Sequence, residues 1–325
     1  MATKTYREAL NEALREEMYR DPNVFIIGQD VGKFEGAYRV TQGLLAEFGP
    51  KRVKDAPISE MAIAGAGIGA AMAGLRPVVE FMTINFTLVA IDQIVNNAAK
   101  IRYMFGGQVS VPMVIRTPGG GGQQLTAQHS QNLENWYANT PGLKVVAPVT
   151  PADAKGLLKA AIRDPDPVFF LENLALYNTR GEVPDEEYEI SIGTADIKRE
   201  GTDISLIAHS RMVNVALQAA QRLQDEEGVS AEVVDIRSLR PLDTETIVNS
   251  VKKTNHAVTV EEGWTTFGVG GEMAALLADQ AFDYLDAPVK RVGGEEVPMP
   301  YSKPLERAVI PSVDKVVSAA MEVLA

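Results

Sequence analysis

The sequence of 325 residues contains no cysteine, which excludes disulfides, thiolate nucleophiles and cysteine-based zinc sites. Its three histidines lie far apart and lack the spacing of metal ligands. No apolar run approaches membrane-spanning length. The 31 basic and 43 acidic residues leave a net charge of −12, which disfavours nucleic acid and anionic membranes. We therefore expect no nucleic-acid partner and no membrane association.

The N-terminal twenty residues lack the apolar core of a secretion signal and have the pattern of an acidic amphipathic helix. We therefore expect the protein in the cytoplasm, or inside an organelle if a targeting segment has been removed. The length suits two domains, each with a core of its own.

Helical and strand patterns alternate along the chain, which predicts parallel or mixed sheets flanked by helices. A polar, charged stretch with glycine and proline, residues 178–203, interrupts the alternation and is expected to connect two α/β domains, 1–185 and 186–325. The predicted helices are 5–20, 60–74, 87–104, one beginning after the N-cap Thr150, 212–227, 243–252, 271–285 and 312–324. The predicted strands are 23–28, 76–82, 111–116, 143–148, 167–172, 204–209, 231–236, 257–262 and 288–292.

The segment "GAGIGA" (65–70) fits a dinucleotide-binding fingerprint, with Glu80 in the place of the ribose-binding acid. This interpretation would make the chain an NAD-binding oxidoreductase. However, the preceding "DAPISEMAIA" is a poor buried strand, and the fingerprint requires one. The alternative is a helix thinned by glycine and alanine so that another element can approach closely.

Glu60 stands at the start of this segment, with Ser59 as the expected N-cap. One interpretation is an acid that complements the helix dipole. The other is a partly desolvated carboxylate, flanked by Ile58, Met61 and Ile63, that shares or donates a proton.

The segment "RTPGGGGQQLTAQHSQ" (116–131) follows a predicted strand, where open parallel sheets place ligand loops. Its four glycines indicate mobility or close backbone approach, and it lacks the Lys and Ser/Thr of a P-loop. His129 in this loop is either a titrating functional group or a solvated spectator. Phe86 is either a core residue or a wall for a flat ring.

Four long segments resemble the beta subunit of the pyruvate dehydrogenase component, a thiamine diphosphate-dependent 2-oxo acid dehydrogenase of the transketolase-like family. They are "PISEMAIAGAGIGAAMAGLRPVVEFMTINF", "AIDQIVNNAAKIRYMFGGQ", "AQHSQNLENWYANTPGLKVVAPVTPADAKGLLKAAIRDPDPVFFLEN" and "SAEVVDIRSLRPLD". The resemblance covers essentially the whole chain. It implies an α/β fold with a pyrimidine-binding domain and a transketolase C-terminal domain. It also implies an α2β2 heterotetramer with thiamine diphosphate at the alpha–beta boundary.

The resemblance assigns roles to several residues. Glu60 matches the glutamate that hydrogen-bonds the aminopyrimidine of thiamine diphosphate and promotes loss of the thiazolium proton. Ile58, Met82 and Phe86 match residues that line the pyrimidine pocket. His129 matches a histidine implicated in acyl transfer to a lipoyl arm. A structural potassium ion is expected at the positions of Met113, Ala161, Ile162, Asp164 and Asp166, mostly through backbone carbonyls. The family often has Asn where this chain has Asp166.

The chain lacks the "GDG" and downstream Asn pair with which thiamine enzymes bind magnesium and diphosphate. The resemblance therefore implies that Mg²⁺ is held by an alpha subunit and that this chain alone is inactive. Pyruvate is the expected substrate, with branched-chain 2-oxo acid and acetoin dehydrogenase beta subunits as alternatives. The other expected partner is the lipoyl-bearing dihydrolipoamide acyltransferase core, with Asp283, Asp286 and the Ala325 carboxylate as candidate docking contacts.

Overall fold

The computed structural model describes residues 1–325, and the chain divides into two compact units. The first contains residues 1–119 and 136–192, and the second contains residues 120–135 and 193–325. The units part at 192/193, inside the predicted connection, whereas a domain boundary at 185/186 stays a prediction. The loop 120–135 groups with the second unit although a strand of the first unit precedes it.

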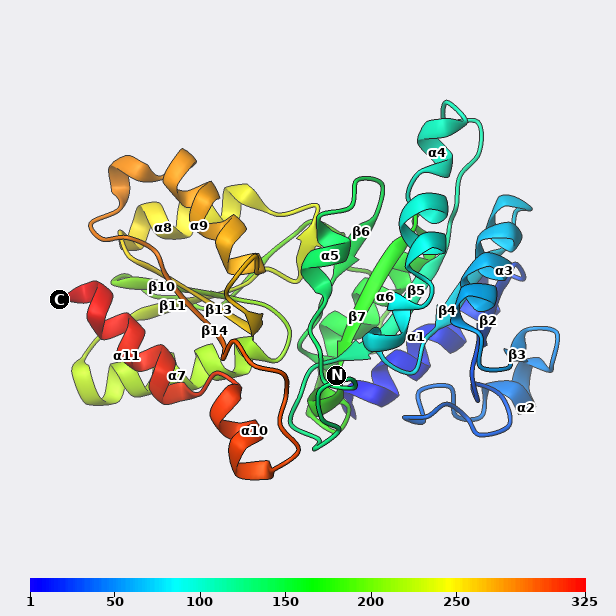
Figure 1. Cartoon of the computed structure of the whole chain (residues 1–325), viewed down its shortest axis with the longest axis horizontal. Coiled ribbons are helices and arrows are strands. Elements are labelled where there is room, and N and C mark those ends of the chain that lie inside the picture. The colour runs from blue at the N-terminus through cyan, green and yellow to red at the C-terminus, as the bar shows by residue number, and fades with distance from the viewer. The chain divides into compact units, whose positions relative to one another are not determined.

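The first unit has a parallel sheet in the order β6-β7-β5-β4-β2-β3 (Figure 1). Helices α1 and α6 pack together on one side of it, and α3 packs against β4 and β2. The strands are β1 (Ala2–Thr5), β2 (Val24–Gly28), β3 (Val53–Asp55), β4 (Arg76–Glu80), β5 (Val114–Gly119), β6 (Lys144–Val146), β7 (Val168–Asn173) and β8 (Arg180–Val183). The helices are α1 (Tyr6–Arg20), α2 (Leu44–Phe48), α3 (Glu60–Met72), η1 (Ile84–Leu88), η2 (Gln93–Ala98), α4 (Ile101–Met104), α6 (Pro151–Arg163) and η3 (Leu174–Leu176).

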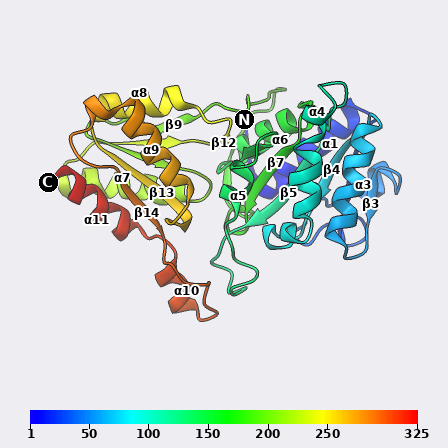
Figure 2. The ribbon, with the colours of Figure 1, turned by 45° about the horizontal axis from the view of Figure 1, so that its top comes forward.

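The second unit has a mixed sheet in the order β14-β13-β10-β11-β9, in which only β9 runs antiparallel to its neighbour. Figure 2 shows α8 and α9 on one face of this sheet and α7 and α11 on the other. The strands are β9 (Asp196–Arg199), β10 (Ile204–Ala208), β11 (Ala231–Asp235), β12 (Ser238–Arg240), β13 (Ala257–Trp264) and β14 (Lys290–Gly294). The helices are α7 (Met212–Glu227), α8 (Thr244–Thr254), α9 (Val269–Gln280), η4 (Phe282–Tyr284), α10 (Lys303–Val309) and α11 (Val313–Leu324), and α5 (Glu134–Ala138) ends the loop segment.

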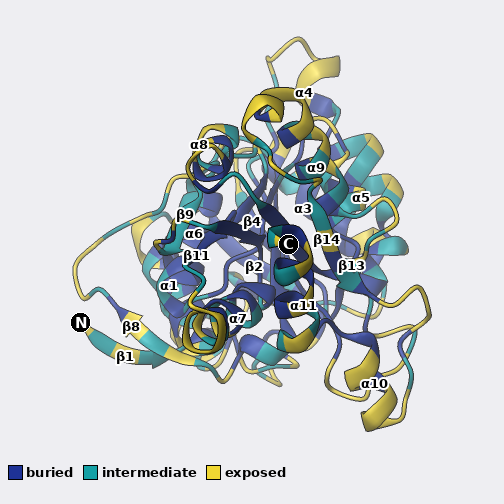
Figure 3. Cartoon of the chain, turned by 90° about the vertical axis from the view of Figure 1, so that its left-hand side faces the viewer, coloured by how far each residue is buried: buried dark blue, intermediate teal, exposed yellow.

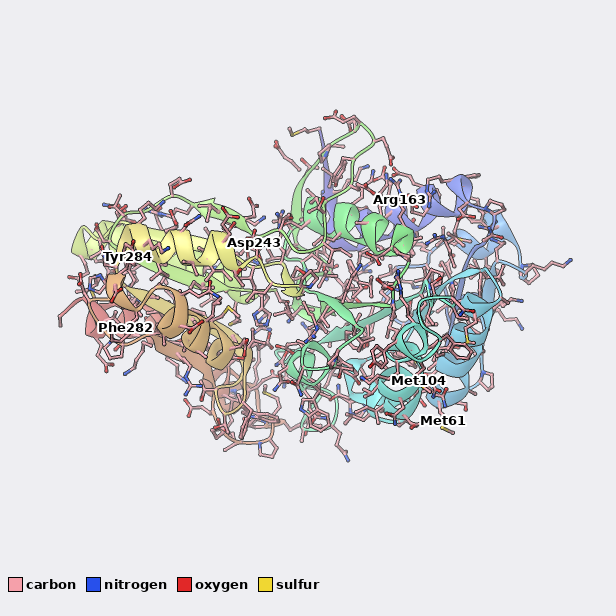
Figure 4. All side chains as sticks on the ribbon, turned by 90° about the horizontal axis from the view of Figure 1, so that it is seen from above. Met61, Met104, Arg163, Asp243, Phe282 and Tyr284 are labelled. Atoms are coloured by element: carbon pink, nitrogen blue, oxygen red, sulfur yellow. The ribbon has the colours of Figure 1, made fainter.

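Local sequence signals explain where the long helices begin. Helix α1 starts with a capping box in which Thr5 and Glu8 exchange hydrogen bonds. Thr150 caps α6 as predicted, accepting a hydrogen bond from the Asp153 amide at 3.0 Å with Pro151 in the first turn. The two helices are also joined by ion pairs, including one at 2.6 Å from Arg163, labelled in Figure 4, to Glu17.

Two predictions about secondary structure were wrong. The helix predicted at 87–104 is divided into η1, the π-helical η2 and the single turn α4, and the backbone spacing changes from i+3 to i+5 along it. The stretch 178–203, predicted to be a polar connection and assigned no strand, holds β8, which pairs with β1, and β9, which pairs with β11. The central strands of both sheets are mostly buried, whereas the edge strands β3, β9 and β14 are partly exposed, and α4 and α10 are largely exposed (Figure 3). No helix has the length and apolar character of a membrane-spanning segment.

Candidate active site

Glu60 begins α3 and is almost completely buried, with 7% of its surface exposed. Ser59 occupies the N-cap position as predicted, although its hydroxyl makes no capping hydrogen bond. Instead, Gln29, which directly follows β2, donates a hydrogen bond from Nε2 to Glu60 Oε1 at 3.1 Å. Neither Lys nor Arg forms an ion pair with Glu60. A buried carboxylate held by a neutral amide donor is poised to accept from, or donate to, a further polar group.

The apolar residues beside Glu60 divide between the interior and the surface. Ile63 is buried, as the hypothesis of a desolvated acid requires. Ile58 and Met61, however, are 82% and 53% exposed (Met61 in Figure 4). Glu60 is therefore buried within its own unit, whereas two of its apolar neighbours in the sequence are exposed. A contiguous apolar surface at such a place would mark a contact with another molecule.

Two further predicted site residues follow strand β4. Met82 and Phe86 are both half-buried. Phe86 lies in η1, whose start is fixed by Thr83, the side chain of which accepts a hydrogen bond from the Asn85 amide. This places Met82 and Phe86 after the carboxyl end of a parallel strand, where ligands bind in open α/β sheets.

A buried ionic network lies at the same ends of the strands and was missed by the sequence analysis. The Arg116 guanidinium contacts Glu80 and Glu172, and Tyr177 donates a hydrogen bond to Glu172 at 2.6 Å. Burial disfavours the charged guanidinium, but Glu172 and Glu80 raise the pKa of Arg116 above its usual value. The sequence carries no local signal of this network, because only the strand register brings Glu80 of β4 and Arg116 of β5 together as paired positions.

His129 belongs to the second unit, in the loop between Gly120 and Asn135. Its side chain is exposed, and its backbone N–H donates to the Thr126 carbonyl at 3.2 Å. The second unit also contains a buried acidic cluster that the sequence analysis did not predict. In it, Glu134 lies 3.2 Å from His209 Nε2, and the Val269 and Gly270 amides donate to Glu261.

The five residues proposed to hold potassium lie near the carboxyl end of α6. Arg76 Nη1 donates to the carbonyls of Ile162 and Asp164 at 2.9 and 3.2 Å. The Lys144 ammonium lies 2.6 and 2.7 Å from the two carboxylate oxygens of Asp164, and Arg102 pairs with Asp166. The carbonyls at a helix C-terminus favour a cation, and each has a second lone pair. The remaining members of the set, Met113 and Ala161, are buried.

Comparison with known proteins places these observations in a family. The model of the transketolase pyrimidine-binding domain matches residues 2–179, and that of the transketolase C-terminal domain matches residues 193–316. The chain is 54% identical over 320 residues to the mitochondrial pyruvate dehydrogenase E1 component subunit beta-2 of Oryza sativa subsp. japonica, covering 97% of this chain and 85% of the relative. It is 52% identical over 319 residues to the pyruvate dehydrogenase E1 component subunit beta of Rickettsia conorii, covering 98% of each. This chain belongs to the family of pyruvate dehydrogenase E1 beta subunits.

A solved structure supports the fold of this E1 beta-family chain. The split-gene transketolase described as an inactive beta4 tetramer has a TM-score of 0.81 and 25% identity, covering 98% of this chain and 97% of that one. The predicted α/β fold and the predicted function, the beta subunit of a thiamine diphosphate-dependent pyruvate dehydrogenase, are thus confirmed at the level of the family.

In this E1 beta-family chain, the position of "GAGIGA" in the fold decides between its two interpretations. Residues 65–70 lie inside α3, five residues after its start, and β3 ends at Asp55. A dinucleotide fingerprint requires the first glycine at a turn directly after a strand, which this segment lacks. Gly67 has a packing role, because a Cβ there would lie 2.5 Å from Val79 of β4.

Proposed function

We propose that this chain contributes the pyrimidine-binding half of a thiamine diphosphate site and completes it with an alpha subunit in an α2β2 heterotetramer. The observation that carries the proposal is Glu60, a buried carboxylate with an amide donor on one oxygen and no cationic partner. Such a group suits a heterocyclic nitrogen with which it shares a proton in an apolar setting. The exposed Ile58 and Met61 beside it are consistent with a surface that the alpha subunit covers.

In this proposal the chain's residues bind and orient, and Glu60 moves a proton. Gln29 fixes the direction of the Glu60 carboxylate, and the half-buried Phe86 packs on the pyrimidine ring with Met82 and Ile58 beside it. When bound, thiamine diphosphate supplies the nucleophilic carbon and the electron sink for decarboxylation of a 2-oxo acid. Pyruvate is the proposed acid, and Mg²⁺ is proposed to be bound by the alpha subunit.

Transfer of the acetyl group to a lipoyl arm is proposed to use His129, whose side chain is exposed and whose two ring nitrogens can donate or accept hydrogen bonds. The acyltransferase core that carries the lipoyl arm is proposed to dock on the second unit near Asp283 and Asp286, with the Ala325 carboxylate as a third candidate. Both aspartates are exposed, and so are the neighbouring Phe282 and Tyr284 (Figure 4). Two exposed acids beside two exposed aromatic side chains suit a partner surface that is basic and partly apolar.

A potassium ion is proposed to stabilise the fold near Met113, Ala161, Ile162, Asp164 and Asp166. The protein itself is proposed to be located in the cytoplasm or inside an organelle, since the relatives include bacterial and mitochondrial proteins.

The deciding experiment is decarboxylation by the chain copurified with its alpha subunit, comparing wild type with Glu60→Gln. The amide keeps the shape of the side chain but cannot exchange the proton, so the rate should fall by about 10²-fold or more. Glu245→Gln, at an exposed position of α8, is the matched control and should retain the wild-type rate.

Branched-chain 2-oxo acids are assayed beside pyruvate, and the chain is also assayed alone. An unchanged rate in Glu60→Gln would reduce Glu60 to an acid that complements the helix dipole. Activity of the isolated chain would refute the shared site.

A further inference from the structure

The four glycines at 119–122 open a loop whose backbone only glycine can adopt readily. Gly120 and Gly122 have φ values of +87° and +93°, in the left-handed region that disfavours side chains. A Cβ on Gly121 would lie 2.7 Å from Met299 Cε. The Gly120 amide donates to the Gln131 carbonyl at 3.3 Å, which closes the base of the loop. The loop is therefore held in one shape at its start, and the glycines serve close approach rather than mobility.

Two buried carboxylates hold this backbone from distant parts of the second unit. Glu306 of α10 accepts hydrogen bonds on Oε1 from the amides of Gly122 and Gln124, at 2.9 and 3.0 Å. Glu262 of β13 accepts one from the Gly121 amide at 2.7 Å. Although α10 is mostly exposed, only 2% of Glu306 is accessible. No cation pairs with it, so the loop amides supply the polar contacts that its buried charge needs.

Arg211, just before α7, completes the arrangement. Its Nη1 donates to the Gly121 carbonyl at 2.8 Å, and its Nε lies 3.3 Å from Glu262 Oε2. The guanidinium thus neutralises Glu262 while binding the same glycine from the other side. Three side chains from three elements therefore fix the backbone from Gly121 to Gln124.

This fixed backbone lies five residues before His129. Gln124 and Thr126 both have positive φ values, +58° and +65°, which non-glycine residues adopt only where the surroundings impose them. The His129 amide then donates to the Thr126 carbonyl, which makes the next turn. The backbone of His129 is consequently reached through a short chain of constrained residues that begins at the two carboxylates.

We propose that Glu306, Glu262 and Arg211 are positioning residues that hold the His129 loop for transfer of the acyl group to the lipoyl arm. The inference rests on the proposed role of His129. Holding the loop matters for this step because a displacement of about 1 Å at a reacting group can cost up to 10²-fold in rate. Glu306 accepts two of the loop's hydrogen bonds, and the second comes from Gln124, the first of the two strained residues.

The test uses the copurified alpha–beta assembly with thiamine diphosphate, a lipoyl domain as acyl acceptor, and an artificial electron acceptor to follow decarboxylation alone. We define the transfer ratio as kcat/KM for acyl transfer divided by kcat for decarboxylation. In Glu306→Ala this ratio should fall about tenfold. In Glu306→Gln the amide oxygen can accept the same two N–H groups, so most of the ratio should be recovered. Glu245→Ala is the control for loss of a surface carboxylate.

A second readout does not depend on activity. Hydrogen exchange in a peptide covering residues 119–129 should be faster in Glu306→Ala than in wild type, with Glu306→Gln between them. Gly122→Ala perturbs the loop itself and leaves Glu306 in place. The φ of Gly122 is positive, and a Cβ on this residue would lie 3.0 Å from Arg211 Nη1. The variant should reproduce both effects even if Glu306→Ala does not fold.

The outcomes separate this inference from the proposed function. His129→Ala is measured in the same assays. If it lowers the transfer ratio while Glu306→Ala and Gly122→Ala leave the ratio unchanged, His129 keeps its role and the positioning inference is overturned. If His129→Ala leaves the ratio unchanged, the proposed role of His129 falls, and the inference falls with it. Equal losses of transfer and decarboxylation in Glu306→Ala would indicate a general structural role and would also overturn the inference.

Discussion

Gln29 donates a hydrogen bond to Glu60 across 3.1 Å, and both side chains are more than nine-tenths buried. A Lys or Arg at position 29 would hold the carboxylate permanently ionised. An amide fixes the direction of the carboxylate without adding an opposite charge, and it leaves the other oxygen available to a ligand. This pairing is the feature of the site that is most readily tested by substitution.

Replacing Gln29 by Leu or by Glu should impair decarboxylation in two different ways. Gln29→Leu removes the only donor to Glu60, and we expect kcat to fall about tenfold because the carboxylate loses its orientation. Gln29→Glu places a second buried carboxyl beside the first, so the pair must share a proton. Its pH–rate profile should therefore move to higher pH. Steady-state decarboxylation across a pH series measures both effects, with exposed Gln280→Leu as the control.

Arg116 should be indispensable for stability. Arg116→Leu leaves Glu80 and Glu172 buried without their cation, which typically costs about 3–5 kcal/mol. The thermal midpoint of the purified assembly should drop by several degrees. The control is Arg15→Leu, because the exposed Arg15–Glu47 pair is worth about 0–1 kcal/mol.

Removing the two acidic charges as well, with Glu80→Gln and Glu172→Gln, should recover part of the loss. No recovery would mean that packing, rather than unpaired charge, determines the role of Arg116.

The acidic cluster of the second unit should make stability depend on pH. Burial raises the pKa of Glu261 to about 7, although the nearby His209 opposes the shift, so the folded state binds a proton more tightly than the unfolded chain does. The contribution of Glu261 to the free energy of unfolding is fully present below about pH 4.5. It is lost as the pH rises through about 7, and the loss is on the order of 3 kcal/mol. Burial lowers the pKa of His209, but the hydrogen bond to Glu134 and the nearby acidic charges together raise it above its usual value. The contribution of His209 to stability is therefore also lost as the pH rises.

The measurement is the thermal midpoint of the assembly from pH 5 to pH 8, for wild type and Glu261→Gln. We expect the wild-type midpoint to fall with rising pH and the slope between pH 5 and pH 7 to flatten in the variant. Glu245→Gln should retain the wild-type slope. If Glu261→Gln keeps that slope too, the titration belongs to other groups.

The fold could be predicted where apolar periodicity and caps act locally. Helix α7 matches the predicted 212–227, and α6 begins at the predicted Thr150 cap. The break of 87–104 into η1, η2 and α4 was not predicted, because the 5 residues of η1 and the 6 of η2 are too few to change the apolar period of the whole stretch. The strands β8 and β9 were missed because their pairing with β1 and β11 is a tertiary effect on polar sequences.

The site could be predicted only in part for a similar reason. Glu60 is conspicuous because an acid at the head of an apolar segment has few local explanations. Its partner Gln29 lies 31 residues earlier in the chain and has no local signal. Glu306 reaches Gly122 across 184 residues, and nothing in the sequence of α10 distinguishes it from a surface acid. Long-range polar contacts follow from strand order and register, and a single sequence does not encode these in any local pattern.

Potassium should stabilise the assembly if the carboxyl end of α6 binds it. A ligand that binds only the folded state stabilises it by about 2.7 kcal/mol at one hundred times its dissociation constant, which amounts to a shift of several degrees in the thermal midpoint. We therefore expect a higher midpoint in potassium chloride than in sodium or choline chloride at equal ionic strength.

Asp166→Ala tests which atom of Asp166 takes part, with the Arg102 ion pair lost in either case. If the contact is a backbone carbonyl, the variant keeps the response to potassium, and if it is the carboxylate, the variant loses that response. Equal midpoints in the three salts would show that Arg76 and Lys144, which already contact the Ile162 and Asp164 oxygens, provide all the positive charge that these oxygens need.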